Sequence, residues 1–336
     1  MNQTQCIAAE ASVVDLKYNI IRGLFIILSS SIILLLLRII WSYKTKSVKL
    51  HTNLIILISN VLFLYAMYVL SHFIESVMNF IVLFTYSDPC KCLIQVWLVY
   101  LIRMPAYFYY LGSPLFHFAI MIERVLATVY VKIYENQGKL FSVICTIVVW
   151  TINLIYGVYI YITTQMDTDT FSHSMVYLTL TTIYNSQIFI YLNFFYLFLV
   201  ICIAIADYYL ILRNQKIKLN FFKSTLNYSL SKSYQSKQNI LLMKIIFPLD
   251  FSYSFVYALF NIMASILRYN REEYGPLFYV RTYDGIALIL IVHAVITLIV
   301  YDYFLKKQNE IKKNFVKINM NMSSEIYFKN LKDSWK

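Results

Sequence analysis

Apolar stretches long enough to cross a membrane recur along the chain. A helix that crosses the hydrocarbon core of a bilayer needs about 20 consecutive, mostly apolar residues. Runs such as IILSSSIILLLLRII, at residues 26–40, do not alternate between polar and apolar positions as the strands of a membrane barrel do. The pattern therefore predicts seven helical spans, at residues 20–41, 53–74, 96–122, 140–162, 188–212, 240–267 and 283–305.

The composition excludes a water-soluble protein. Hydrophobic residues make up 60% of the 336 residues and charged residues 14%, whereas soluble domains average about 45–50% and about 25%. With only 6 Gly, 5 Pro and 5 Cys, collagen-like and disulfide-rich small folds are also excluded. We expect an all-α membrane protein, a seven-transmembrane helix bundle surrounded by the lipid bilayer.

Lysine and arginine predict how the chain is threaded. The first, third and fifth connections and the tail carry several times as many Lys and Arg as the opposite connections, and basic loops stay in the cytoplasm. The N-terminus is then outside and the C-terminus inside. We expect an extracellular segment at 1–19, a seven-helix transmembrane domain at 20–305 and a basic cytoplasmic tail at 306–336. The net charge of +12 reflects this topology and does not indicate a nucleic-acid partner.

A Glu-Arg pair ends the third predicted span. Glu123 and Arg124 lie where the helix would meet the cytoplasm. A guanidinium can pair with its neighbour in one conformation and with another group in a second, which suits an activation latch. The alternative is that the two charges only mark a helix end among lipid headgroups.

Arg103, Tyr110, His117 and Arg124 follow each other at intervals of seven and so share one stripe of this helix. Charged groups inside a span normally face the bundle interior or a wet cavity. Arg103 lies about 30 Å along the helix from Glu123. We therefore expect it at the outer mouth, as a counter-charge for acidic ligands, or else reaching to the outer headgroups.

Further candidates for a ligand pocket lie in spans three, six and seven. Tyr107 and Tyr110 would provide apolar walls with a polar tip. Pro248 makes a hinge in span six, and the nearby Asp250 is expected to be neutral, paired with His293, or simply packed in the interior. The predicted pocket residues are Arg103, Tyr107, Tyr110, His117, Asp250 and His293.

Three cysteines fall on the predicted outer side, where disulfides persist. Cys6 can pair with Cys90 or with Cys92, or Cys90 and Cys92 can pair with each other. A disulfide from Cys6 to one of the other two is favoured, because it would join the N-terminus to the start of span three. Asn2 begins a glycosylation sequon on the same side.

After the last span, apolar residues at 304, 311, 315 and 318 share one helical face, with lysines mostly opposite. This predicts a short amphipathic helix on the inner leaflet, the alternative being a solvated tail. No metalloprotease, P-loop, serine-hydrolase or zinc-spaced motif occurs. We therefore expect no enzyme, no cofactor and no metal.

Several short segments resemble a known family. They are Gln5-Cys6, KLHTNLIIL from Lys49, YSDPC ending at Cys90, the Arg-x-Pro from Arg103 to Pro105, IERVLATVYVKIYE from Ile122 to Glu135, and YFKNLKDSW ending at Trp335. Together they resemble the nematode serpentine chemoreceptors of the Sra superfamily, with the Srab branch favoured over Sre and Sra.

The resemblance implies a G-protein-coupled chemoreceptor in the plasma membrane of a sensory neuron, in its cilium. Its partners would be a small-molecule ligand and a heterotrimeric G protein. We expect the ligand to enter from outside between spans three, five, six and seven. Glu123 and Arg124 match the cytoplasmic latch of such receptors, although Val125 replaces the usual aromatic residue. A seven-span ligand-gated channel and a small-molecule transporter are the alternatives; the channel would have the opposite orientation, and the transporter duplicated halves.

Overall fold

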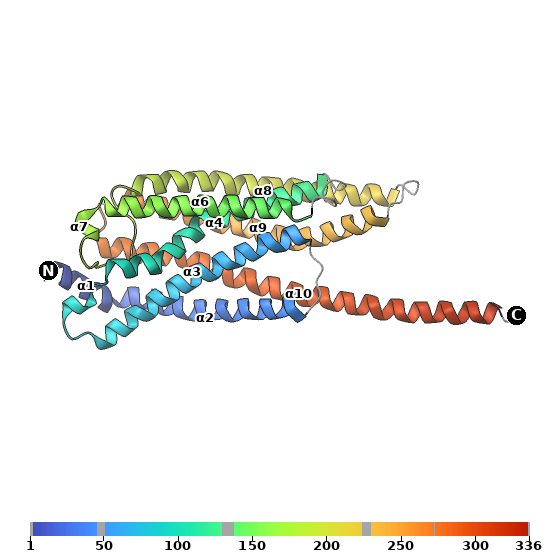
Figure 1. Cartoon of the computed structure of the whole chain (residues 1–336), viewed down its shortest axis with the longest axis horizontal. Coiled ribbons are helices and arrows are strands. Elements are labelled where there is room, and N and C mark those ends of the chain that lie inside the picture. Colours follow the sequence, from blue (N-terminus) through green and yellow to red (C-terminus); the bar gives the residue numbers. More distant parts are fainter. Residues whose placement is uncertain (1–2, 46–50, 130–137, 224–229, 272, 335–336) are drawn as a thin grey trace.

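The computed structural model describes residues 3–45, 51–129, 138–223, 230–271 and 273–334. Seven long helices form the bundle (Figure 1): α2 (Leu16–Thr45), α3 (Thr52–Thr85), α4 (Val96–Val129), α6 (Leu140–Gln165), α8 (Ser186–Lys223), α9 (Leu230–Tyr269) and α10 (Pro276–Ser334). Three short helices complete the described chain: α1 (Gln3–Val14), the 3-10 helix η1 (Pro89–Cys92) and α7 (Thr168–Phe171).

Six of the long helices are apolar and long enough to cross a membrane, among the residues that the structure describes. The seventh, α4, has 34 residues but contains many tyrosines, two prolines and a histidine, which lower its hydropathy. Most of its side chains between Val99 and Thr128 are buried, so α4 faces protein rather than lipid. Large apolar side chains on the other helices, such as Leu34, Ile155 and Phe198, are exposed, as expected of a surface in contact with lipid.

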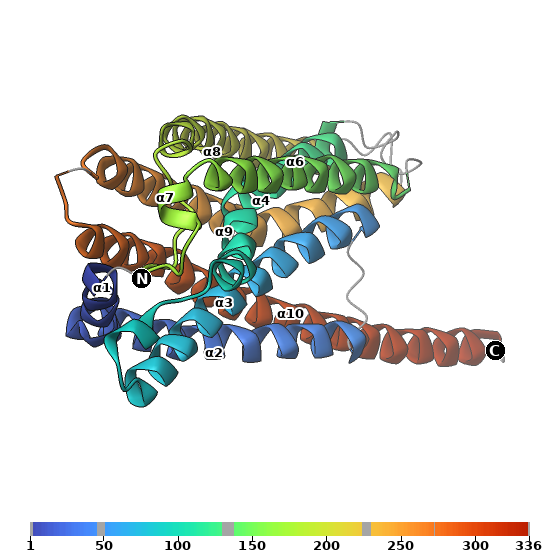
Figure 2. The same cartoon turned by 60° about the vertical axis from the view of Figure 1, so that its left-hand side comes forward.

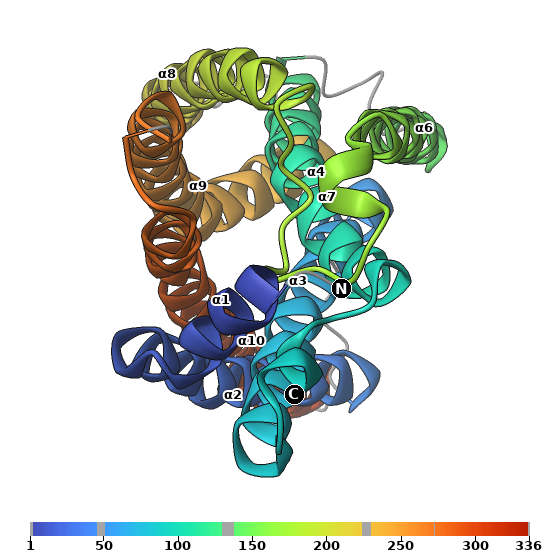
Figure 3. The same ribbon diagram turned by 90° about the vertical axis from the view of Figure 1, so that its left-hand side faces the viewer.

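Helix α4 lies at the centre of the bundle and contacts α3, α6, α8 and α9. Viewed along the bundle, α6 lies at its outer edge (Figure 3). Gly112 lets α4 approach α6 closely, since a Cβ atom there would lie 2.7 Å from Nδ2 of Asn153. Buried tyrosines, among them Tyr65, Tyr68 and Tyr109, fill the space between α3 and α4.

One end of the bundle is closed by a disulfide between Cys6 of α1 and Cys90 of η1, and we call it the disulfide end. The segment at 172–185, between α7 and α8, crosses this end (Figures 2 and 3). Its Met175 pairs with Ile94 through two backbone hydrogen bonds of 2.7 and 2.9 Å. We call the opposite end, where α4 finishes at Val129, the far end.

The long helices extend beyond most of the predicted spans. Helix α3 continues past residue 74 to Thr85, and the polar residues Glu75 and Asn79 in this extension are buried. The predicted amphipathic helix is not a separate element either. Its residues are helical, but they continue α10 without a break to Ser334, past the bundle (Figure 1).

Candidate functional site

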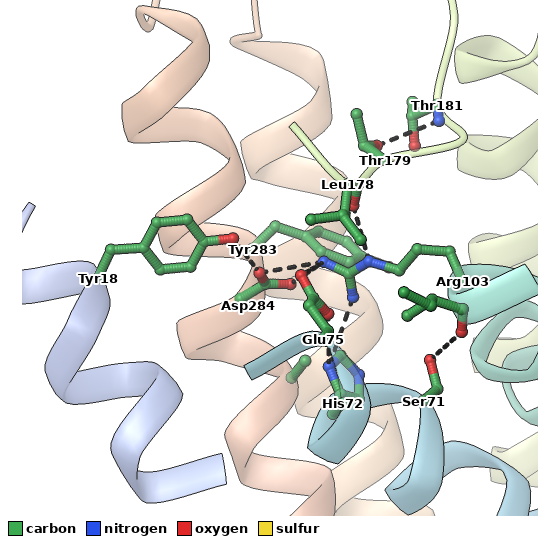
Figure 4. Close-up of polar contacts among 12 residues, drawn as sticks. Tyr18, Ser71, His72, Glu75, Arg103, Leu178, Thr179, Thr181, Tyr283 and Asp284 are labelled. Carbon is green, nitrogen blue, oxygen red and sulfur yellow. Dashed lines mark hydrogen bonds and ion pairs between the residues drawn. The ribbon is translucent and has the colours of Figure 1, made fainter. Parts of the chain in front are cut away.

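A buried cluster of ion pairs and hydrogen bonds joins four helices near the disulfide end (Figure 4). Arg103 of α4 places its Nη2 atom 2.7 Å from Oε1 of Glu75 in α3, and 3.1 and 3.2 Å from the two carboxylate oxygens of Asp284 in α10. Tyr18 of α2 donates a 2.6 Å hydrogen bond to Asp284. The cluster therefore holds four helices together by charge-assisted contacts, which are the strong ones at low dielectric.

The other donors of Arg103 are also engaged. Its Nε atom donates to the carbonyl of Leu178 at 2.7 Å, which fixes the segment that crosses the disulfide end. Its Nη1 atom lies 3.4 Å from Nδ1 of His72. Arg103 is 5% exposed, so the expectation that it reaches the headgroups is wrong. Arg103 was predicted to pair with the acidic group of a ligand, but in the structure it pairs with the carboxylates of Glu75 and Asp284.

Two small cavities lie beside this cluster: the first between α4, α10 and the segment at 172–185, and the second among α4, α6, α8, α9 and α10. Each encloses about 20 Å³, and both are lined by Tyr107, Tyr110 and Tyr283. The first borders Arg103 and Asp284; the second, which we call the aromatic cavity, is further lined by Tyr156, Phe189, Leu192, Asn193, Tyr196, Tyr257, Phe260 and Arg268. Because a volume of that size holds about one water molecule, a ligand could enter only if side chains move.

The remaining predicted pocket residues lie farther along the bundle. His117 of α4 contacts Asp250 of α9 at 2.9 Å, and its ring stacks on Tyr253 at 3.8 Å. The expected pairing of Asp250 with His293 is wrong, because His293 contacts the Ser252 hydroxyl at 3.0 Å instead. His117 and Asp250 border a separate, mostly apolar cavity of about 80 Å³. The predicted residues therefore belong to more than one cavity.

The Glu-Arg pair near the far end is buried. Arg124 donates from Nη2 to Oε1 of Glu123 at 2.5 Å and from Nε to Oε2. The two residues are 2% and 0% exposed, so they do not lie among lipid headgroups. Pro248 lies within α9 as predicted, two residues before Asp250. A proline in a helix removes a backbone hydrogen bond and permits bending.

The disulfide between Cys6 and Cys90 is one of the pairings that the sequence left open, and it leaves Cys92 as a buried free thiol. Burial, together with the nearby Glu10, raises the pKa of Cys92 above its ordinary value. The thiol is therefore protonated and poorly reactive at neutral pH. Asn2, the glycosylation candidate, lies outside the described residues. Within those residues, no cluster of His, Cys, Asp and Glu could hold a metal ion.

Sequence reasoning missed Glu75, Asp284, Tyr18 and Arg268. Glu75 and Asp284 are acidic residues within long apolar helices, and such residues normally pair with a cation. That rule, applied to Arg103, would have indicated carboxylate partners. It would not have told which carboxylates, because the partners are far from Arg103 in the sequence.

Seven long helices with an apolar exposed surface, and with charged residues paired in the interior, define a multi-pass membrane protein of the seven-helix receptor type. The chain belongs to the family of serpentine type 7TM GPCR receptor class ab chemoreceptors, whose model matches residues 2–336. The resemblance found in the sequence is thereby confirmed. This is a family of receptors and not of enzymes. A comparison with curated proteins gave no match.

Proposed function

We propose that this receptor binds a small molecule near the disulfide end and relays binding to a heterotrimeric G protein at the far end. Family membership supports the chemosensory role. The distribution of Lys and Arg supports a threading with the disulfide end outside the cell. The receptor would then act in the plasma membrane of a sensory neuron, with the ciliary membrane as its site of exposure to chemical cues.

The observation that carries this proposal is that one buried helix connects the two regions. Tyr107 and Tyr110 of α4 line the two small cavities, and the Glu123–Arg124 pair lies farther along the same helix. Tyr110 and Arg124 are about 21 Å apart along the helix axis. A shift of α4 at the cavities therefore reaches the pair without an intervening loop.

Helix α9 provides the second connection. Tyr257 of α9 donates a hydrogen bond to the backbone carbonyl of Tyr110, and Asp250 contacts His117. Pro248 marks the point where α9 can bend, and the cavity of about 80 Å³ is lined by Leu249 and Asp250. The space beside the bend gives α9 room to move with limited loss of packing elsewhere.

Binding shifts the receptor between states only if the ligand prefers one of them. The small cavities exclude ligands in this structure, so a ligand selects a state in which these cavities are larger. In that state α9 pivots at Pro248 and Arg124 exchanges its bond with Glu123 for other contacts. The far end, including the connection between α8 and α9, then becomes available to a G protein.

The test expresses the tagged receptor in cultured cells that report second messengers, with a panel of odorants. R124A should reach the cell surface like the wild type and lose the response, while K17A, at an exposed position near the disulfide end, should retain it. An N-terminal epitope should be detected on intact cells. Unchanged signalling by R124A would remove the latch role. An epitope that is detected only after permeabilisation would favour the seven-span channel.

A further inference from the structure

A second arginine in this region, Arg268, is buried without a carboxylate partner. It is 8% exposed, and it forms no ion pair with an acidic residue of the described chain. Its Nη2 atom donates to the Tyr283 hydroxyl at 3.1 Å. Its Nε atom is buried and has no hydrogen-bond acceptor in the described part of the molecule. Arg268 thus differs from Arg103, whose charge is balanced by Glu75 and Asp284.

The protein stabilises this cation only in part. The guanidinium lies over the rings of Phe189 and Tyr283, with distances to the ring centroids of 5.1 and 5.2 Å. Arg268 is also in the last turn of α9, where the helix dipole favours positive charge. These contacts provide no hydrogen-bond acceptor for the buried Nε atom and no negative charge to balance the guanidinium. An added anion that accepts a hydrogen bond from Nε would therefore be bound favourably.

The surroundings of Arg268 specify the rest of the ligand. Phe189, Tyr257 and Phe260 line the aromatic cavity with ring surfaces, which favour a flat apolar group. The hydroxyl of Tyr196 is buried without a hydrogen-bond partner among the described residues, so a second polar atom of a ligand could pair with it. The cavity thus combines a cation without a carboxylate partner, the unpaired hydroxyl of Tyr196 and aromatic walls.

We propose that the aromatic cavity binds a small organic carboxylate whose anionic group pairs with Arg268 and whose aromatic or unsaturated body packs among the rings. This inference rests on the proposed receptor function and names its ligand class. A guanidinium can bind a carboxylate through two parallel hydrogen bonds. In Arg268, the Nε atom, which has no acceptor among the described residues, and a neighbouring terminal nitrogen would donate these two hydrogen bonds.

The size of the cavity links binding to conformational change. A volume of about 20 Å³ is about that of one water molecule and is too small for an aromatic acid. An aromatic acid can enter only if the rings of α4, α8 and α9 separate. The carboxylate therefore favours the expanded state, because only in that state can it reach the buried Nε atom.

The experiment measures binding to the purified full-length receptor in lipid nanodiscs. The probes are acid and amide pairs with the same carbon skeleton: benzoate and benzamide, phenylacetate and phenylacetamide, 3-phenylpropionate and its amide. At least one acid should bind at least tenfold more tightly than its amide in the wild type. This preference should vanish in R268Q, weaken in R268K and persist in R271Q.

Arg271 is the matched control, because it is a half-buried arginine nearby whose guanidinium lies over the Tyr279 ring at 5.4 Å. If R268Q does not fold, Y196F with the wild-type arginine should keep the acid preference and lower the affinity of the acid two- to fivefold. Equal affinities of acids and amides, an acid preference that survives in R268Q, or no binding of any acid at millimolar concentration would each overturn the proposal.

Parallel signalling measurements separate this proposal from the proposed function. A receptor that signals to neutral odorants, and whose R268Q variant responds equally well, would keep the receptor function and refute the carboxylate site. Acid binding that depends on Arg268 but evokes no second messenger in any cell would support the site and contradict G-protein signalling.

Discussion

Replacing Arg103 with alanine should destabilise the receptor strongly. The substitution removes a guanidinium that contacts Glu75 in α3, Asp284 in α10 and the Leu178 carbonyl. The two carboxylates remain in place, at 4% and 3% side-chain exposure, so water cannot replace the lost partner without opening the bundle. Breaking a buried ion pair by removing one partner costs about 3–5 kcal/mol, and we expect a loss in that range.

The assay follows the apparent melting temperature of the detergent-solubilised receptor, with the fraction of receptor at the cell surface as a second measurement. All variants are heated at one rate, because membrane receptors commonly unfold irreversibly. R103A should melt well below the wild type, R103K should be intermediate because an ammonium keeps the charge but not the fork of donors, and R271A should resemble the wild type.

A triple variant separates the ion cluster from a general packing effect. R103A combined with E75Q and D284N leaves no unpaired charge in the ion cluster, so it should recover at least half of the lost stability. If R103A melted like the wild type, the buried cluster would not stabilise the fold. If the triple variant were no more stable than R103A alone, the loss would come from the missing side chain and not from the stranded carboxylates.

Three further substitutions test other parts of the structure by the same melting assay. C6S should lower stability by about 4 kcal/mol, because the disulfide closes a loop with a sequence separation of 84 residues, whereas C92S should have little effect. G112A should cost about 1–3 kcal/mol, since its added methyl group would collide with α6, while G23A, with open space around it, should be tolerated. D250A should cost about 3 kcal/mol by stranding its histidine partner in α4, and D250N less, because an amide still accepts a hydrogen bond.

The bundle itself could be predicted because each span carries its own signal. A run of about 20 apolar residues reports a membrane helix without knowledge of any other part of the chain. Helix α4 was found in the sequence even though its tyrosines lower its hydropathy. Its Pro105 and Pro114 lie inside the helix and do not end it. The sequence left Cys90 and Cys92 as possible partners of Cys6. It could not decide between them, because they lie two positions apart in one short segment.

The polar contacts could not be predicted because they depend on how helices are rotated and shifted against each other. Arg103 meets Asp284 across 181 positions of the sequence, and no local pattern encodes that register. Asp250 of α9 contacts His117 of α4, whereas His293 of α10 contacts Ser252, and this choice depends on how α9 is oriented toward its two neighbours. The continuation of the last helix beyond its predicted span was missed for a related reason, since the residues that follow the span are compatible both with a separate helix and with a continuous one.

Because α10 is continuous from the ion cluster to its C-terminal end, a small tilt at the cluster produces a large displacement at that end. Asp284 belongs to the ion cluster, and Ser334 ends the same helix, roughly 75 Å away at the usual rise per residue. If the helix moves as one rod, a tilt of about 5° pivoting at the carboxylate displaces its other end by about 6 Å. The displacement near Ser334 is therefore much larger than the movement at Asp284. A fluorophore pair with one dye near Ser334 would detect a tilt of α10 that is too small to measure at the ion cluster.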